Sequence, residues 1–80
     1  MPSRPHDPAT TAKLKRLGKN VKLARIEAEL AQDELAREAG TTRAHVSGIE
    51  RGMVNISAAT VFKLAAALEV DPGDLFQGIE

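Results

Sequence analysis

The side chains best suited to molecular recognition lie in one short segment, residues 42–51. Val46 and Ile49 are three positions apart, so they share one face of a helix that turns 100° per residue. The opposite face holds small or hydrogen-bonding residues, namely Ala44, Ser47, Gly48 and Arg51, with Arg43 and His45 on its two flanks. A helix with a small-residue middle and hydrogen-bond donors at its ends fits the major groove of DNA, which is about 12 Å wide.

Four residues of this face are the candidate base-contacting residues: Arg43, Ala44, His45 and Ser47. An arginine can hold guanine O6 and N7 with two hydrogen bonds, worth about 1–3 kcal/mol of discrimination. The helix dipole gives a cation no structural reason to stand at a helix N-terminus. Ala44 fits either a contact with a thymine methyl group or a plain helix former. His45 fits either a base or phosphate contact or an ordinary surface position.

Five helices are expected to position this segment, which makes the fold all-α. Apolar periodicity and capping residues predict them over Thr11–Ala28, Gln32–Ala39, Thr42 to Glu50 or Arg51, Ser57–Glu69 and Pro72–Gln77. The buried stripe of the first is expected to be Leu14, Leu17, Val21, Ala24 and Ala28. Gly40 ends the second helix, and Thr42 caps the third. The second and third helices together predict a helix-turn-helix.

Between Leu17 and Phe76 the chain resembles the lambda-repressor-like, or Xre-type, helix-turn-helix family. The resemblance rests on Leu17-Gly18, Val21, Arg25, Leu30, Gln32, Glu34-Leu35-Ala36, Ala39-Gly40, Thr42, Val46-Ser47, Ile49-Glu50-Arg51-Gly52, Asn55, Ser57, Val61, Lys63-Leu64-Ala65, Ala67-Leu68, Val70 and Leu75-Phe76. It implies a five-helix DNA-binding domain with its helix-turn-helix at the second and third helices. The runs Gly48–Gly52 and Asn55–Ser57 are also similar to those of restriction–modification controller proteins.

The resemblance also implies roles for single residues. The expected phosphate-contacting residues are Gln32, Thr42, Arg51 and Asn55, and a structural ion pair is expected between Arg25 and Glu50. Two positions depart from the family pattern. Glu29 stands where the family usually has glycine, and Ala31 where it usually has a serine or threonine cap. We therefore expect a longer first helix and a less sharply defined start of the second.

A second copy of the chain is the expected protein partner, because one recognition helix reads only a few base pairs. Apolar residues near the C-terminus exceed the obvious needs of a four-helix core, and they form the expected dimer interface: Phe62, Val70, Leu75, Phe76 and Ile79. The alternative for Leu75 and Phe76 is that they fold back and complete the core of the monomer.

Composition argues against other kinds of chemistry. The sequence of 80 residues has no cysteine, so it offers no thiol nucleophile, disulfide or thiolate zinc site. His6 and His45 are far apart, and the sequence has no nucleophile–base pair or phosphate loop. A chain this short also has little room to enclose a substrate pocket. We therefore expect no enzyme activity, no metal and no cofactor.

Pro2, Pro5 and Pro8 predict a flexible arm over residues 1–10, which leaves residues 11–80 as the DNA-binding domain. No run of about 18 apolar residues exists, so no membrane-spanning helix is expected. The first ten residues lack the apolar stretch of a secretion signal. These features predict a cytoplasmic protein.

Charge is unevenly distributed although the formal net charge is zero. Residues 1–25 hold seven basic side chains and one acidic one, whereas residues 26–80 hold four basic and ten acidic. This basic edge is either a solvated helix face or a surface for a polyanion.

We expect a sequence-specific transcription regulator that binds palindromic operator DNA as a homodimer. An autoregulatory controller of a restriction–modification system is the narrower form of this prediction, and RNA polymerase is a further candidate partner. The alternative is a protein-interaction module, such as an antitoxin-like partner.

Overall fold

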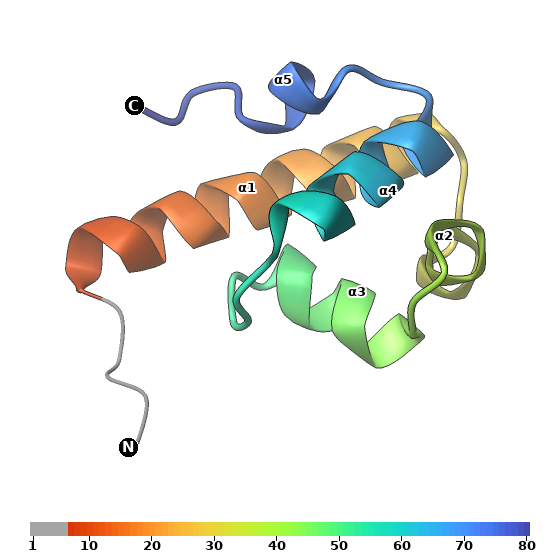
Figure 1. Ribbon diagram of the computed structural model, residues 1–80, viewed down its shortest axis with the longest axis horizontal. Coiled ribbons are helices and arrows are strands. Elements are labelled where there is room, and N and C mark those ends of the chain that lie inside the picture. The colour runs from red at the N-terminus through yellow and green to blue at the C-terminus, as the bar shows by residue number, and fades with distance from the viewer. Residues whose placement is uncertain (1–6) are drawn as a thin grey trace.

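The structure, a computed structural model, describes residues 7–80 and contains five helices in that range, which confirms the predicted all-α fold (Figure 1). They are α1 (Pro8–Glu27), α2 (Gln32–Ala39), α3 (Arg43–Glu50), α4 (Ala58–Leu68) and α5 (Pro72–Leu75). Figure 1 shows α1 running the length of the molecule, with α4 across it, α2 and α3 below it and α5 above it.

The first helix begins and ends earlier than predicted. It begins at Pro8, because the side chain of Asp7 accepts a hydrogen bond of 2.7 Å from the backbone N–H of Thr10. Proline at the first helical position needs no hydrogen bond of its own. Residues 8–10 of the predicted arm are therefore helical, while residues 1–6 lie outside the described part. The helix also ends at Glu27 and does not extend through Glu29, whose φ is 59°.

The inner helices have the predicted limits. Gly40 ends α2 with φ of 71°, and the side-chain oxygens of Thr42 and Ser57 cap α3 and α4. The last helix is shorter than predicted, since α5 ends at Leu75 and residues 76–78 form turns. Asp71 precedes α5 but makes no side-chain capping bond.

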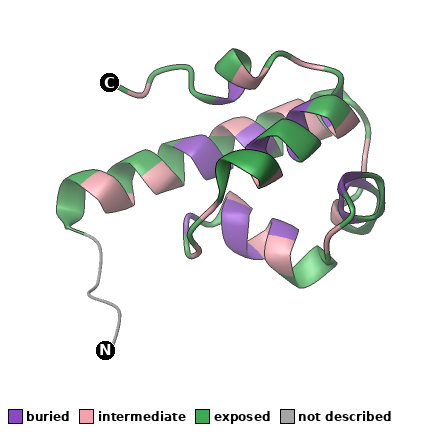
Figure 2. Cartoon of the chain, in the orientation of Figure 1, coloured by how far each residue is buried: buried purple, intermediate pink, exposed green. Residues whose placement is uncertain are grey.

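The core lies where α1, α2, α3 and α4 face one another, as the buried residues in Figure 2 show. Its largest fully buried side chains are Leu35, Leu64, Leu75, Val21 and Val46. On α1 the predicted stripe is correct at Leu17 and Val21, which are buried, and Leu14 and Ala24 are half-buried. Ala28 is exposed, against the prediction, because it lies beyond the end of the helix.

The C-terminal segment is held on α1 by two polar side chains. The Asn20 amide donates to the carbonyl oxygens of Leu75, at 2.8 Å, and of Gln77, at 2.9 Å. The Arg16 guanidinium donates to the same Gln77 oxygen at 3.2 Å. These bonds fix the backbone on both sides of Phe76. Within residues 7–80, no helix combines the length and apolar character needed to cross a membrane.

Candidate nucleic-acid interface

The turn between α2 and α3 is built by local backbone bonds. Gly40 takes the left-handed conformation, and the N–H of Thr41 then donates to the Ala36 carbonyl oxygen at 2.8 Å. Val46 and Ile49 are buried against the other helices. As a result α3 lies at the lower edge of the molecule in Figure 1, with its outer side uncovered by other helices.

Four of the predicted DNA-contacting residues come together at this edge. Gln32, from the first turn of α2, and Arg43, Ala44 and Ser47, from α3, line one shallow hollow of about 260 Å³. Arg43 and Ala44 are exposed, and Ser47 is half-buried. The hollow therefore offers a cation, an apolar methyl group and a hydroxyl group side by side.

A buried ion pair supports this hollow from behind. Arg25 Nε lies 2.7 Å from Glu50 Oε2, and Arg25 Nη2 donates to Glu50 Oε1 at 3.2 Å. The two side chains are only 13% and 4% exposed. Arg25 Nη1 also donates to the Leu30 carbonyl oxygen at 2.7 Å. The side-chain hydrogen bond to Glu50 raises the pKa of Arg25, although burial acts in the opposite direction. The pair therefore ties α1 to the end of α3 and compensates the charge of Glu50.

Gln32 belongs to the same network. Its amide Nε2 donates to Glu50 Oε1 at 3.1 Å. This bond was not predicted from the sequence, which suggested only a phosphate contact for Gln32. It fixes the side chain at the start of α2 relative to α3.

Two residues of the recognition helix differ from their predicted surroundings. Gly48 is buried rather than outward-facing, because Val54 of the following loop packs over it; a Cβ at Gly48 would lie 3.0 Å from Val54 Cγ1. His45 is half-buried, and its Nε2 is buried without a hydrogen-bond partner. The open outer face therefore consists of Arg43, Ala44, Ser47 and Arg51.

The candidate phosphate contacts stand at the two ends of α3. Thr42 is exposed before the helix, and its Oγ1 accepts a hydrogen bond of 3.1 Å from the His45 N–H. Arg51 is exposed after the helix, where its Nε donates to the Ser47 carbonyl oxygen at 3.3 Å. Asn55 is exposed in the loop that follows.

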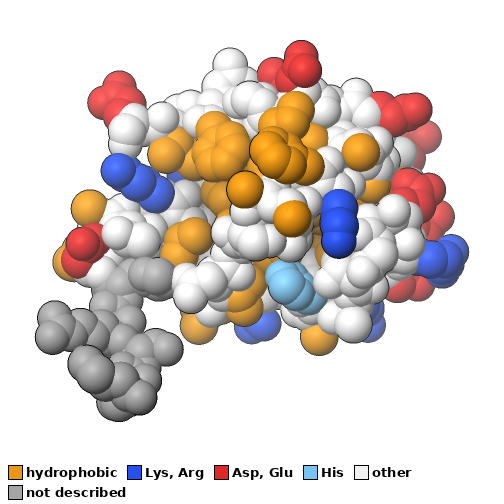
Figure 3. Space-filling view, viewed as in Figure 1, with side chains coloured by type: hydrophobic (Ala, Val, Ile, Leu, Met, Phe, Trp, Pro, Cys, Tyr) orange, Lys and Arg blue, Asp and Glu red, His pale blue; other side chains and the backbone are white. Residues whose placement is uncertain are grey.

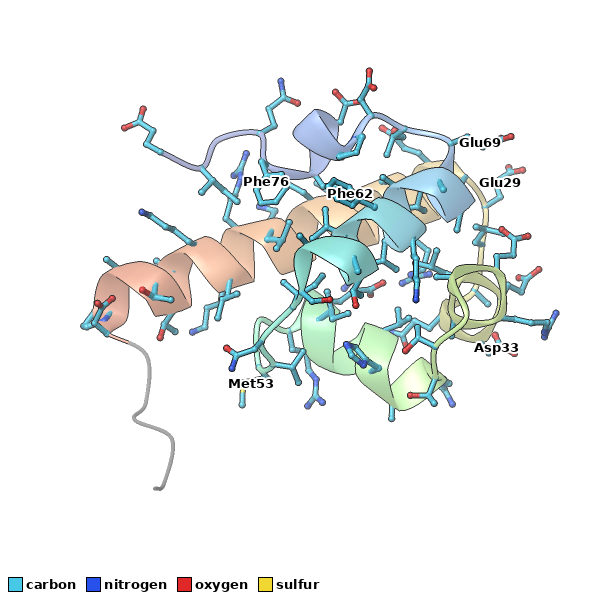
Figure 4. The ribbon with its side chains drawn as sticks, viewed as in Figure 1. Glu29, Asp33, Met53, Phe62, Glu69 and Phe76 are labelled. Atoms are coloured by element: carbon cyan, nitrogen blue, oxygen red, sulfur yellow. The ribbon has the colours of Figure 1, made fainter. Side chains whose placement is uncertain are left out.

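The apolar residues predicted for a dimer interface divide into two groups. Leu75 is only 1% exposed and completes the monomer core, so its assignment to the interface was wrong. Phe62 and Phe76 are 58% and 44% exposed. Figure 4 places both on the face that carries α4 and the C-terminal segment, and Figure 3 shows apolar side chains gathered there. Val70 and Ile79 are half-buried.

Sequence reasoning overlooked two surface features. Met53, 68% exposed, follows the recognition helix directly and is labelled near α3 in Figure 4. Asn20 holds the C-terminal segment, and the available signal was a poor helix former in the middle of a long helix.

Comparison with known proteins identifies the group to which this architecture belongs. The family model for helix-turn-helix domains, HTH_3, matches residues 21–75. The crystal structure of the restriction–modification controller protein C.AhdI from Aeromonas hydrophila is similar with a TM-score of 0.80 and 38% identity, over 81% of this chain and 98% of that protein.

Two relatives by sequence agree. The control protein C.BamHI of Bacillus amyloliquefaciens is 37% identical over 59 residues, which are 72% of this chain and 73% of the relative. A hypothetical transcription factor of Neisseria meningitidis is 43% identical over 54 residues, and the matched part spans about half, 51%, of that protein. The family contains transcription factors rather than enzymes, in agreement with the sequence-based expectation. The chain thus belongs to the HTH_3 helix-turn-helix family of DNA-binding transcription regulators and is related to the restriction–modification controller proteins.

Proposed function

We propose that the chain regulates transcription by binding a palindromic operator as a homodimer, with α3 in the major groove. Within this class we propose an autoregulatory controller of a restriction–modification system, on the basis of its similarity to C.AhdI and C.BamHI. The observation that carries the proposal is the hollow formed by Gln32, Arg43, Ala44 and Ser47 at the uncovered edge of α3.

Direct base contacts fall to the exposed first turn of α3 in this proposal. Arg43 holds a guanine with two hydrogen bonds, Ala44 touches a thymine methyl group, and Ser47 bonds a base or a phosphate. His45 has the smallest share, because its Nε2 is buried.

Phosphate contacts position the helix without reading sequence. Gln32 and the free N–H groups at the start of α2 hold one phosphate. Thr42 stands beside the N-terminus of α3, and Arg51 and Asn55 hold the backbone beyond its C-terminus. Glu50 does not repel DNA, because its carboxylate already accepts hydrogen bonds from Arg25 and Gln32.

A dimer doubles the number of base pairs read and places two recognition helices about 34 Å apart on one side of the duplex. Phe62 and Phe76, with Val70 and Ile79 beside them, form the interface in this proposal. RNA polymerase is the further partner proposed for activation, through the acidic side chains remote from α3.

Replacement of Arg43 by alanine tests the role of α3. The operator is first recovered by in-vitro selection from random-sequence duplex DNA, and binding is measured by fluorescence anisotropy. Loss of a bidentate contact worth about 1–3 kcal/mol predicts about 5- to 150-fold weaker operator binding. Specificity should relax at one base pair of each half-site, while binding to random-sequence DNA changes far less.

Arg37→Ala is the matched control, because Arg37 is an exposed arginine on the neighbouring helix α2 and lies outside the hollow. Equal losses for the two variants would contradict the proposal. Failure of selection to yield any protected sequence at low ionic strength would instead favour a protein-interaction module.

A further inference from the structure

The basic side chains of α1 are arranged in a stripe that the proposed α3 contacts do not use. Lys15, Lys19 and Lys22 are spaced four and three residues apart, so they lie within about 60° of one another around the helix. All three are exposed. Residues 8–26 contain no acidic side chain, and within residues 7–80 the three lysines make no ion pair.

Such a stripe does not stabilise the helix that carries it. Like charges at this spacing repel one another by a few tenths of a kcal/mol per pair. The helix gains its stability elsewhere, from the Asp7 cap, the buried residues Leu17 and Val21, and the Arg25–Glu50 pair. The lysines therefore have no evident role within the monomer.

The stripe lies on the flank of α1 that adjoins the end of α3. A Cβ at Gly52 would lie 2.7 Å from both the Cα and the Cγ of Lys15, so the stem of Lys15 runs directly against the turn after Arg51. Gly18, on the adjoining side of α1, is packed against the backbone of Glu50. The other flank of α1 instead holds the C-terminal segment, through Arg16 and Asn20.

We propose that Lys15, Lys19 and Lys22 form a second phosphate-binding surface, which continues the backbone contacts of α3 along the duplex outside the groove that α3 occupies. This proposal rests on the proposed function. Lys15 extends the contact begun by Arg51, and Lys19 and Lys22 follow on the next turns of α1. The stripe adds affinity for any duplex and reads no sequence. It also gives a protein of zero net charge a local cationic surface for a polyanion.

The salt dependence of binding tests this surface. Each neutralised phosphate contributes about −0.9 to the slope of log K against log salt. Three lost contacts should therefore make the slope of the combined Lys15→Gln, Lys19→Gln and Lys22→Gln variant less steep by about 2.7. Affinity at 50 mM salt should fall at least about tenfold, by similar factors for the selected operator and for a random-sequence duplex.

A charge-matched control separates local contacts from long-range attraction. Lys13→Gln, Arg37→Gln and Lys63→Gln together remove the same three charges from exposed positions outside the stripe. Lys13 is the sharpest part of this control, because it lies on α1 beside the apolar groove that contains Phe76 and Ile79. The control should keep a slope close to that of the unaltered chain. Circular dichroism and sedimentation equilibrium verify that both variants fold and assemble alike.

Equal slopes and affinities for the two triple variants would overturn the stripe. The experiment reports separately on the proposed function, because equal affinity of the unaltered chain for the operator and the random duplex would refute sequence-specific regulation. The comparison of slopes on the random duplex would still decide the role of the lysines.

Discussion

Glu29 and Glu69 both have a left-handed backbone, with φ of 59° and 57°. Each follows the end of a long helix, α1 or α4, and Figure 4 labels both near these ends. A side chain with a Cβ pays about 1–2 kcal/mol in this conformation, whereas glycine adopts it freely. The helix ends are therefore imposed by the packing that follows them and not by the local preference of glutamate.

Glu29→Gly should consequently stabilise the protein. Relief of the left-handed strain exceeds the entropy that glycine adds to the unfolded chain, which leaves a gain of about 0.5–1 kcal/mol. Urea unfolding followed by circular dichroism measures this change. Glu38→Gly is the matched control, since it removes an exposed acid from inside α2 and should destabilise by about 1 kcal/mol. A Glu29→Gly variant that loses stability would show that the glutamate side chain makes a compensating contact.

At the scale of the elements, the crossing of α1 and α3 depends on one glycine. A Cβ added to Gly18 would collide with the carbonyl oxygens of Ile49 and Glu50 in the last turn of α3. Backbone cannot move aside as the end of a flexible side chain can, so the two helices would have to separate. This separation would also strain the Arg25–Glu50 pair, which spans the same crossing.

Gly18→Ala should therefore destabilise the protein by at least about 3 kcal/mol, the upper range for overpacking. Thermal unfolding checks the value. Gly73→Ala makes the same chemical change in α5, where a Cβ would meet no atom within 4 Å, and it should leave stability nearly unchanged. Similar melting temperatures for the two variants would mean that the α1–α3 crossing can relax.

Local signals were enough to predict the elements that carry the site. Gly40, Thr42 and the apolar pair Val46 and Ile49 fixed α2, the turn and α3, because capping and periodicity act within a few residues. The exception at this scale was the start of α1, where the signal of Asp7 and Pro8 was present but overlooked.

Contacts between distant segments could not be predicted in the same way. The burial of Gly48 depends on where the loop places Val54. The bond from Gln32 to Glu50 depends on how α2 and α3 cross. Glu29 is the instructive case, because the departure from glycine was noticed but the longer helix inferred from it does not form. Tertiary packing here outweighs the backbone preference of the residue.

For the whole molecule, the C-terminal segment divides apolar residues between the core and the surface. Leu75 faces inward and is fully buried, whereas its neighbour Phe76 remains 44% exposed. Asn20 holds the backbone on both sides of Phe76, so this ring is presented from a fixed segment. Phe62 of α4 is still more exposed, at 58%. Fixed aromatic rings on one face lose little entropy on association, which favours a second copy of the chain as the occupant.

Phe62→Ser should therefore weaken dimerisation without unfolding the monomer. We expect the unaltered chain to be dimeric at micromolar concentration in sedimentation equilibrium, and the variant to be mainly monomeric with an unchanged thermal midpoint. Operator binding should weaken in parallel, because the energy that links two half-sites is lost. Ile26→Ser controls for the loss of an exposed apolar side chain, since Ile26 is 53% exposed on α1 and lies outside this face. A persistent monomer before any substitution, or a Phe62→Ser variant that dimerises normally, would move the interface elsewhere and leave the two aromatic rings without an assigned partner.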